Sequence, residues 1–336
     1  MPVSVFGVRV CSLAVKIYET GHSADRTADV MREVMWEVHV LRQIRQPQFH
    51  VATLLDAIEF PDAAYVVMER YNGPDLQEYI QAQPSGVLSE ARARRFFCHM
   101  LAGIRHAHTR GFLHCDVKPA NVRLNAACDV AVVVDWGMAR SIHTSRESIS
   151  RGTPSYASPE QLTGHNPEQA WGMPSLGPAA DVWSLGASLH QMIRGGVPFG
   201  GDSFEELIGN VMRRRYKTSR SGRPVVDASA AAQRVIDSML QILPSERASI
   251  DELCADPWVV VDGHLPPPVP LPPVTGIIKG ADALVAPSPL RELMLRHQDT
   301  LLKVGYALLV VGTLLAHSYY AGGEDALGLE HDVRES

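Results

Sequence analysis

The sequence predicts an α+β fold with a small strand-rich first part and a larger helical second part. Before about residue 70, runs of β-branched and apolar residues are separated by turn residues, which is typical of strands. From Gly186 to Trp258 the apolar residues recur mostly at helical spacing. The chain has 336 residues, enough for one large domain or two small ones.

Each element follows from a local pattern. Strands are predicted at 8–18, 51–58, 63–69 and 130–134 from their β-branched and apolar content. A helix is predicted at 24–45, where Val30, Val34, Val38 and Leu41 fall on one stripe. A second helix is predicted from Ser89, a good N-cap residue, to His108.

The composition narrows the class of protein. Hydrophobic residues make up 46% and charged residues 20%, as in ordinary globular proteins. The net charge of −6 lacks the basic balance of nucleic-acid binders, so no nucleic-acid partner is expected. The five cysteines form no CxxC pair, and the first residues form no basic leader with a long apolar core. Reduced thiols and a cytoplasmic location are therefore expected.

Two features set the C-terminal region apart. Residues 266–273 read PPPVPLPP, which favours an extended spacer and predicts a Pro-rich linker at 263–288. Residues 289–336 are predicted to be a helical tail whose apolar stretch 301–320 is a candidate transmembrane segment. Basic residues precede this stretch and acidic residues follow it, so the preceding part would face the cytoplasm. The alternative is an amphipathic helix that packs on the domain or on a partner.

The segment HCDVKPANV, residues 114–122, carries the strongest chemical signal. Asp116 can accept a proton from a hydroxyl group, Lys118 can neutralise phosphate charge, and Asn121 can bind Mg²⁺ through its amide oxygen. Asp135 follows an apolar strand and precedes Gly137, which suits a second metal ligand. These residue types together suit metal–phosphate chemistry.

Two further candidates lie near the start of the chain. Lys16 lies on the first predicted strand, within the sequence LAVK. Glu37 lies on the predicted helix 24–45, one face of which can turn toward that strand.

At this point the sequence resembles the protein kinase family, in eight motifs that occur in the family's order. The motifs are LAVKIY (13–18), EVHVLRQI (37–44), YVVMERYNGPDL (65–76), HCDVKPAN (114–121), DWG (135–137), GTPSYASPE (152–160), DVWSLG (181–186) and SERASIDELCADPWV (245–259). Such a set in order is specific, although each motif alone is weak. The resemblance covers residues 5–260 and implies a two-lobed fold, with a reduced N-lobe at 1–71 and a C-lobe at 72–262.

The resemblance also implies an activity and a role for each residue. The activity is transfer of the γ-phosphate of MgATP to a Ser or Thr hydroxyl of a protein substrate. Catalysis would use Asp116, Lys118, Lys16 and Glu37. ATP would be bound by Lys16, by the backbone of Glu69 and Tyr71, and by Asp75, Asn121 and Asp135, of which the last two hold Mg²⁺. Arg247 would pair with Glu160.

The main departure from the family is the glycine-rich loop upstream of the lysine. Only Phe6-Gly7 corresponds to it, and Gly7 lies nine residues before Lys16. Three explanations are open: a sequence whose start omits the loop, a pseudokinase that acts as a scaffold with impaired ATP binding, and a working kinase with a minimal lobe. Upstream coding sequence with an in-frame G-x-G-x-x-G would favour the first.

Three smaller departures concern the site itself. Trp136 replaces the phenylalanine of the family's D-F-G motif, and its bulky apolar side chain is expected to pack under the helix that carries Glu37. Cys115 replaces the arginine that usually reads a phosphate on the activation segment, so such control is expected to be weak, and the thiol is expected to be inert. Arg123 replaces an apolar residue beneath adenine, where its aliphatic stem can serve but an unpaired buried guanidinium would be costly. Arg123 therefore favours impaired nucleotide binding.

Overall fold

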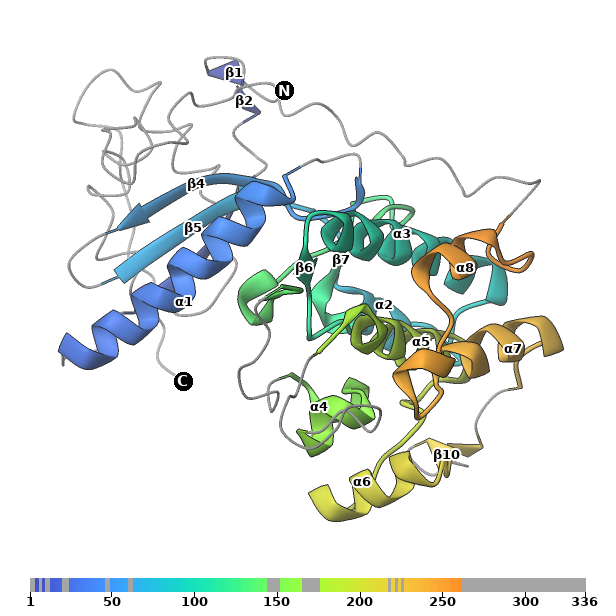
Figure 1. The fold of residues 1–336 in the computed structure, drawn as a ribbon. Coiled ribbons are helices and arrows are strands. Elements are labelled where there is room, and N and C mark those ends of the chain that lie inside the picture. The colour runs from blue at the N-terminus through green and yellow to red at the C-terminus, as the bar shows by residue number, and fades with distance from the viewer. Residues whose placement is uncertain are drawn as a thin grey trace, which may run out of the picture. The chain divides into compact units, whose positions relative to one another are not determined.

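A computed structural model describes 4–5, 8–9, 13–19, 24–45, 49–59, 63–143, 152–164, 176–216, 219–220, 223–224 and 227–260 (Figure 1). The described residues form two compact units. One contains the residues up to Val34 together with Leu54–Arg70, and the other contains Met35–Thr53 and the residues from Tyr71 onward. The first is rich in strands and the second in helices, which confirms the predicted α+β class.

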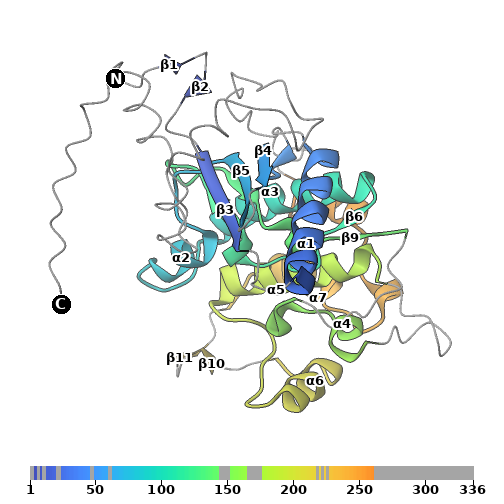
Figure 2. The same ribbon diagram turned by 90° about the vertical axis from the view of Figure 1, so that its left-hand side faces the viewer.

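The first unit contains a three-stranded antiparallel sheet in the order β3-β5-β4 (Figure 2). Its strands are β3 (Leu13–Glu19), β4 (Leu54–Glu59) and β5 (Ala63–Glu69). All seven residues of β3 pair with β5, with Lys16 opposite Val66. Separately, β1 (Ser4–Val5) pairs antiparallel with β2 (Val8–Arg9), and the described residues of the strand predicted at 8–18 lie in β2 and β3.

The helix α1 (Ala24–Gln43) agrees with the predicted helix to within two residues. Val34, Val38 and Leu41 of the predicted stripe are buried. After this helix the chain does not enter β4 at once. His50 has a positive φ of 60°, and Val51 forms a bridge with Val133 in the second unit. The strand predicted from residue 51 therefore begins three residues later, at Leu54.

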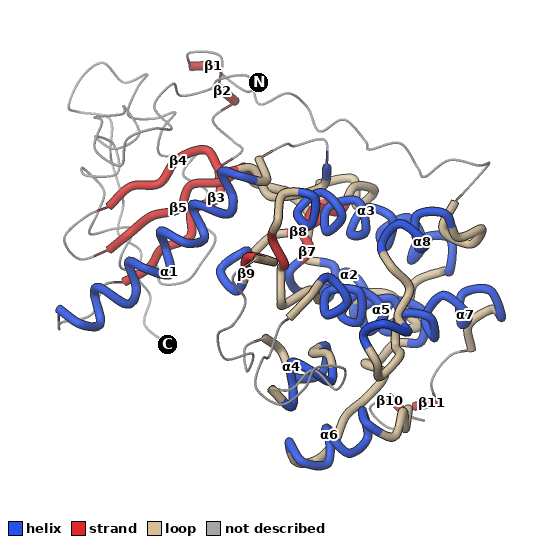
Figure 3. The backbone as a smooth tube through the Cα atoms, in the orientation of Figure 1, coloured by secondary structure: helices blue, strands red, loops and turns tan. Residues whose placement is uncertain are grey.

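The second unit is mainly helical (Figure 3). Its helices are the later part of α1, then α2 (Leu76–Gln81), α3 (Glu90–Thr109), α4 (Pro159–Thr163), α5 (Pro178–Arg194), α6 (Phe204–Met212), α7 (Ala230–Met239) and α8 (Ile250–Ala255). The central helix α5 packs against α3 and α7. The hydroxyl of Ser89 accepts a hydrogen bond from the backbone of Arg92, which confirms the predicted N-cap of α3.

Short antiparallel strand pairs complete this unit and carry the segments of interest. β6 (Phe112–Leu113) pairs with β9 (Arg140–Ser141), and β7 (Val122–Leu124) pairs with β8 (Ala131–Val133). A third pair is β10 (Ser219–Arg220) with β11 (Arg223–Pro224). The segment between β6 and β7 contains HCDVKPAN, and the segment between β8 and β9 contains DWG, so both motifs are held at strand ends.

The predictions for the C-terminal region lie outside the described residues. These are the Pro-rich linker at 263–288 and the tail at 289–336 with its candidate transmembrane segment 301–320. Within the part of the chain that the structure describes, no helix has the length and hydropathy needed to span a bilayer.

Candidate active site

The loop that begins at His114 is anchored to α5 by a buried carboxylate. The backbone amides of His114 and Cys115 donate to the two oxygens of Asp181, each at 2.8 Å. His108 bonds the same carboxylate at 2.8 Å. Burial alone raises the pKa of Asp181, but the hydrogen bond and charge of His108 and the amide of His114 outweigh it, so the pKa is lowered. Asp181 thus remains ionised and fixes the loop.

The ring of His114 is held by the adjacent backbone. Its Nδ1 accepts from the backbone amide of Asp116 at 3.2 Å, and its Nε2 lies 3.1 Å from the carbonyl of Val134. An amide can only donate, so Nδ1 is unprotonated and Nε2 carries the proton that is donated to Val134. This neutral tautomer joins the loop before Asp116 to the residue before Asp135.

Asp116 lies at the centre of a compact polar group. Its carboxylate accepts from Lys118 Nζ at 2.7 Å through one oxygen and from the backbone amide of Thr153 at 2.8 Å through the other. Lys118 also donates to the hydroxyl of Thr153 at 2.5 Å. The side chain of Asp116 is 9% exposed and that of Lys118 is 20% exposed. A carboxylate and an ammonium are therefore fixed side by side within reach of a ligand from solvent.

Asn121 and Asp135 are the predicted metal ligands. The amide nitrogen of Asn121 donates to Asp116 at both the backbone carbonyl and the carboxylate, each at 2.9 Å, so the amide oxygen remains as the acceptor for a cation. The backbone carbonyl of Asn121 accepts from Val134 at 2.9 Å, which ties Asp135 to the same loop. Asp135 is exposed, with a left-handed backbone at φ 61°. One amide and one carboxylate oxygen fit Mg²⁺, which keeps several waters of its own.

The DWG segment is fixed by its neighbours. Trp136 is fully buried beside the ring of His114, with 4.6 Å between the ring centroids. The indole of Trp36 on α1 donates to the carbonyl of Ala139 at 2.7 Å. Tryptophan therefore fills the position of the family's phenylalanine while Asp135 stays exposed.

The segment that includes Asp75 lies against β7. The amide of Gly73 donates to Leu124 at 2.9 Å, and an added Cβ on Gly73 would meet the carbonyl of Asn125 at 2.3 Å. Asp75 accepts from the amide of Glu78 at 2.8 Å and so caps α2. This bond occupies one carboxylate oxygen of the residue predicted to reach the ribose.

Arg123 has an acidic partner. Its side chain is 27% exposed, and its guanidinium lies 3.9 Å from the carboxylate of Glu78. It lies on β7 opposite Val132, and its backbone bridges to Asp75. The guanidinium is therefore neither fully buried nor unpaired, which weakens the argument that Arg123 opposes nucleotide binding.

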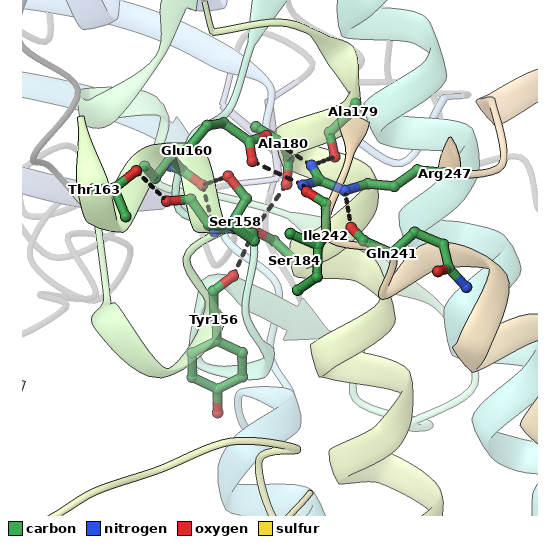
Figure 4. Close-up of polar contacts among 12 residues, drawn as sticks. Tyr156, Ser158, Glu160, Thr163, Ala179, Ala180, Ser184, Gln241, Ile242 and Arg247 are labelled. Carbon is green, nitrogen blue, oxygen red and sulfur yellow. Dashed lines mark hydrogen bonds and ion pairs between the residues drawn. The ribbon is translucent and has the colours of Figure 1, made fainter. Parts of the chain in front are cut away.

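The motif GTPSYASPE (152–160), which corresponds to the end of the family's activation segment, is held by Arg247, as the resemblance implies. Arg247 donates to both oxygens of Glu160 at 2.7 and 2.8 Å (Figure 4). The same guanidinium donates to three backbone carbonyls, those of Ala179, Gln241 and Ile242. Nearby, Ser184 of α5 donates to the carbonyl of Tyr156 at 2.9 Å.

The remaining predicted site residues divide between the two units. Lys16 on β3 and Glu69 at the end of β5 belong to the first, and Glu37 on α1 and Tyr71 belong to the second. Lys16 is half-buried, and Glu37 is buried. The pairing of Lys16 with Glu37, and the contacts of Glu69 and Tyr71 with a nucleotide, stay predictions.

Thr153 is the site residue that sequence reasoning did not single out. It lies within the quoted motif GTPSYASPE, seven residues before Glu160, but nothing local indicates that it contacts Lys118. The approach depends on Gly152, which has a φ of 112° and lies so close to Cys115 that a Cβ would be 2.8 Å from the carbonyl of Cys115. The only local sequence signal for this contact is that Gly152 directly precedes Thr153, a residue with a hydroxyl group.

Cys115 is buried in an apolar cluster with Leu113, Leu176 and Ala180. Burial is the main cause that raises the pKa of its thiol, and the charge of Asp181 raises it further. A protonated thiol without access to solvent is a poor nucleophile, in agreement with the inert role expected from the sequence.

Comparison with known proteins decides the family. The protein kinase domain model matches residues 8–259. The chain belongs to the protein kinase family. It is 30% identical over 266 residues to the SNF1-related protein kinase catalytic subunit alpha KIN12 of Arabidopsis thaliana, covering 79% of this chain and 49% of that protein. It is 31% identical over 252 residues to CBL-interacting protein kinase 4 of Oryza sativa subsp. japonica, covering 74% and 52%.

A third kinase relative is the probable serine/threonine-protein kinase MARK-C of Dictyostelium discoideum, which is 30% identical over 242 residues, covering 69% of this chain and 29% of that protein. The kinase domain thus spans about half the length, or less, of these relatives. The match begins at residue 8, before Lys16, and ends just after the last described helix.

Proposed function

We propose that this kinase chain is a protein serine/threonine kinase that transfers the γ-phosphate of MgATP to a protein hydroxyl. The observation that carries the proposal is the group formed by Asp116, Lys118 and Thr153. A carboxylate that can take a proton stands beside an ammonium that can neutralise phosphate charge, and Thr153 bonds both. Phosphoryl transfer depends mainly on such positioning and charge.

Each residue has a role in this reaction. Asp116 orients the substrate hydroxyl and accepts its proton, while Lys118 neutralises charge on the phosphoryl group. Asn121 and Asp135 bind Mg²⁺, which supplies charge neutralisation when bound. Lys16, supported by Glu37, binds the α- and β-phosphates. The backbone of Glu69 and Tyr71 binds adenine, and the second carboxylate oxygen of Asp75 binds the ribose.

The substrate class rests on similarity and on charge. Relatives of this chain carry the name serine/threonine-protein kinase, which supports a Ser or Thr hydroxyl as the acceptor. The net charge of −6 lacks the excess of Lys and Arg that is typical of proteins that bind nucleic acids. A protein substrate is therefore proposed.

The test is phosphate transfer from labelled ATP to a generic Ser/Thr protein substrate. Asp116→Asn removes the proton acceptor with little change of shape, and we expect transfer to fall to background. Asp202→Asn makes the same change at an exposed aspartate and should transfer at the wild-type rate. Equal transfer by Asp116→Asn and wild type would refute the catalytic role.

The alternative is a pseudokinase that acts as a scaffold with impaired ATP binding. It is suggested by the sequence before Lys16, in which only Phe6-Gly7 corresponds to the family's glycine-rich loop. The ion pair of Arg123 with Glu78 weakens the other support, which was the expected cost of an unpaired buried guanidinium. Calorimetric titration with MgATP separates the two: binding at micromolar to millimolar concentration that requires Mg²⁺ favours the kinase, and no binding favours the scaffold.

We also propose that the kinase domain works in the cytoplasm and is attached to a membrane through 301–320. The proposal rests on the apolar sequence of that stretch and on the basic residues before it. Carbonate extraction of a tagged chain with and without residues 300–336 tests it. Release of the full-length chain by carbonate would exclude a spanning segment.

A further inference from the structure

One face of α6 exposes hydrophobic side chains to solvent. Phe204 is 47% exposed and Met212 is 44% exposed, and Ile208 between them is half-buried. Only four large hydrophobic side chains are exposed among the residues that the structure describes, and two of the four lie on this short helix. Residues four apart in a helix lie on the same face, so Phe204, Ile208 and Met212 form one apolar row.

Another face of the same helix supplies its packing within the second unit. Leu207 and Val211 are buried, and α6 packs against α4. Figures 1 and 2 both show α6 at the outer edge of this unit. The two ends of the apolar row are therefore left outside the packing of the unit.

A second row lies beside the first and carries opposite charges at its ends. It consists of Glu205, Gly209 and Arg213, which are also four residues apart, and both charged residues are exposed. The guanidinium of Arg213 donates to the carbonyl of Gly209 at 3.4 Å, so this side chain lies along the helix. Gly209 has no side chain of its own. The charged row is therefore acidic at one end, basic at the other and low in the middle.

We propose that this face of α6, made of the two rows, binds the same face of a second copy of the chain, with the two helices antiparallel. Such a contact has a two-fold axis, so each residue meets one that lies equally far on the other side of the centre. The apolar row is centred on Ile208, so Phe204 lies against Met212 of the second copy. Gly209 lies next to the centre and lets the two helices come close. This inference does not depend on the proposed function.

The charged row favours the same antiparallel arrangement. It is centred on Gly209, so the arrangement brings Glu205 to Arg213 of the second copy, twice in each dimer. A parallel arrangement would bring each charge to its own kind, and like charges that face each other oppose binding. The two rows thus require the same two-fold axis to within one residue. A face that complements itself in both its apolar and its charged residues indicates a second copy as its partner.

The contact is small, because α6 has only nine residues. Interfaces at the low end of the size range bind weakly and transiently, so we expect a dissociation constant of about 10–100 μM for the dimer. Association therefore has to be measured over a wide range of protein concentration.

Sedimentation equilibrium of the full-length chain measures this association. Glu205→Lys and Arg213→Glu each bring like charges together, so each single variant should raise the dissociation constant more than about tenfold. Both substitutions on one chain restore opposite charges and should return the constant to the wild-type value. Glu246→Lys is the matched control, because Glu246 is exposed but lies outside α6, and it should leave the constant unchanged.

A mixture of the two single variants tests the geometry directly. Where the Glu205→Lys chain meets the Arg213→Glu chain, the charges are opposite at both contacts. An equal mixture should therefore form dimers at concentrations at which each variant alone is monomeric. Energy transfer between differently labelled chains detects these mixed dimers, and their formation also shows that both variants are folded.

The apolar row is tested separately. Phe204→Gln should raise the dissociation constant about tenfold, whereas Met35→Gln, which changes another exposed hydrophobic side chain on α1, should not change it. A chain that stays monomeric well above the expected dissociation constant would overturn the proposal and leave this face to a different protein. Association that does not respond to the charge reversals would also overturn it, because the contact would then lie on another part of the chain.

Discussion

Arg247 and Glu160, 87 residues apart in the sequence, form a buried pair with two parallel hydrogen bonds. Their side chains are 0% and 2% exposed. The remaining donors of the guanidinium bond backbone carbonyls, so the charge of each partner is compensated in the interior. The pair thus joins the segment that carries Thr153 to the end of the domain.

Substitution of Arg247 should destabilise the fold strongly. Arg247→Met leaves the carboxylate of Glu160 buried without its partner, and we expect a loss of about 3–5 kcal/mol in the free energy of unfolding. Arg105→Met provides the control, because Arg105 pairs with Asp251 at the surface, where the two side chains are 50% and 78% exposed. That change should cost less than about 1 kcal/mol. Urea unfolding measures both free energies. Similar losses in the two variants would contradict the conclusion that burial makes the pair of Arg247 with Glu160 more important.

The hydroxyl of Thr153 should matter for the rate of transfer. Thr153→Ala removes the oxygen that accepts from Lys118, and a hydrogen bond to a charged group contributes about 1.5–3 kcal/mol. We expect kcat for a Ser/Thr substrate to fall about ten- to a hundredfold, and Thr153→Ser to restore most of it.

Thr163→Ala is the control for that prediction. Its hydroxyl donates to the carbonyl of Pro159 on α4, whereas the hydroxyl of Thr153 accepts from Lys118. Initial rates at saturating MgATP should be close to wild type for this variant. A loss in Thr163→Ala equal to that in Thr153→Ala would mean that the segment, and not the hydroxyl, is responsible.

Local sequence patterns predicted the elements that local forces determine. The strand at 63–69 and the cap at Ser89 are predicted at the residues where they occur, because a short apolar run and a helix cap depend on neighbours in sequence. The pair of Glu160 with Arg247 was predicted from the resemblance and not from any pattern around either residue. The family resemblance therefore supplied the long-range contact that periodicity cannot supply.

Features that depend on the path of the chain were missed. Thr153 reaches Asp116 across 37 residues, through a turn at Gly152 that only the folded structure reveals. Likewise, Val51 looks like the start of a strand, but it bridges to Val133 instead. The ion pair of Arg123 could not be predicted from the local sequence, because its partner Glu78 lies on a separate element, α2. Each contact is set by tertiary packing, which overrides local preference.

Cys115 should not accept the arginine that the family usually has at its position. Cys115 is 5% exposed and packs with Leu113, Leu176 and Ala180, so Cys115→Arg would bury a guanidinium in an apolar cluster. We expect a loss of more than about 3 kcal/mol in the free energy of unfolding. Retention of the wild-type urea midpoint would show that the cluster opens to admit the charge.

The control for this prediction is Cys128→Arg. Cys128 also has a positive φ, 52° against 66° for Cys115, so both substitutions meet a similar backbone constraint. Cys128 is only half-buried, in the turn between β7 and β8. Replacement of Cys128 should change the urea midpoint little. If the two substitutions lowered the free energy of unfolding equally, backbone strain and not burial of the charge would be the cause.

Two histidines are stacked in the interior at the start of β8. The rings of His50 and His99 have centroids 4.2 Å apart, and both bond the backbone of Ala131. Burial lowers the pKa of His99 to about 3, helped by the positive charge that His50 can carry, and burial also lowers the pKa of His50. Both imidazoles are therefore neutral in the folded protein at pH 7.

Acid should destabilise the protein through this pair. Between about pH 6.5 and pH 3 the unfolded chain binds a proton at His99 that the folded chain does not, so stability decreases as the pH falls below 6.5. Between pH 7 and pH 5, His99 alone should lower the free energy of unfolding by about 2 kcal/mol. His99→Gln keeps an acceptor for the amide of Ala131 without a titrating ring, and its urea midpoint should change less over this interval. A variant with the same pH dependence as wild type would place the acid sensitivity at other groups, such as His190, whose pKa is lowered to about 4 chiefly by burial.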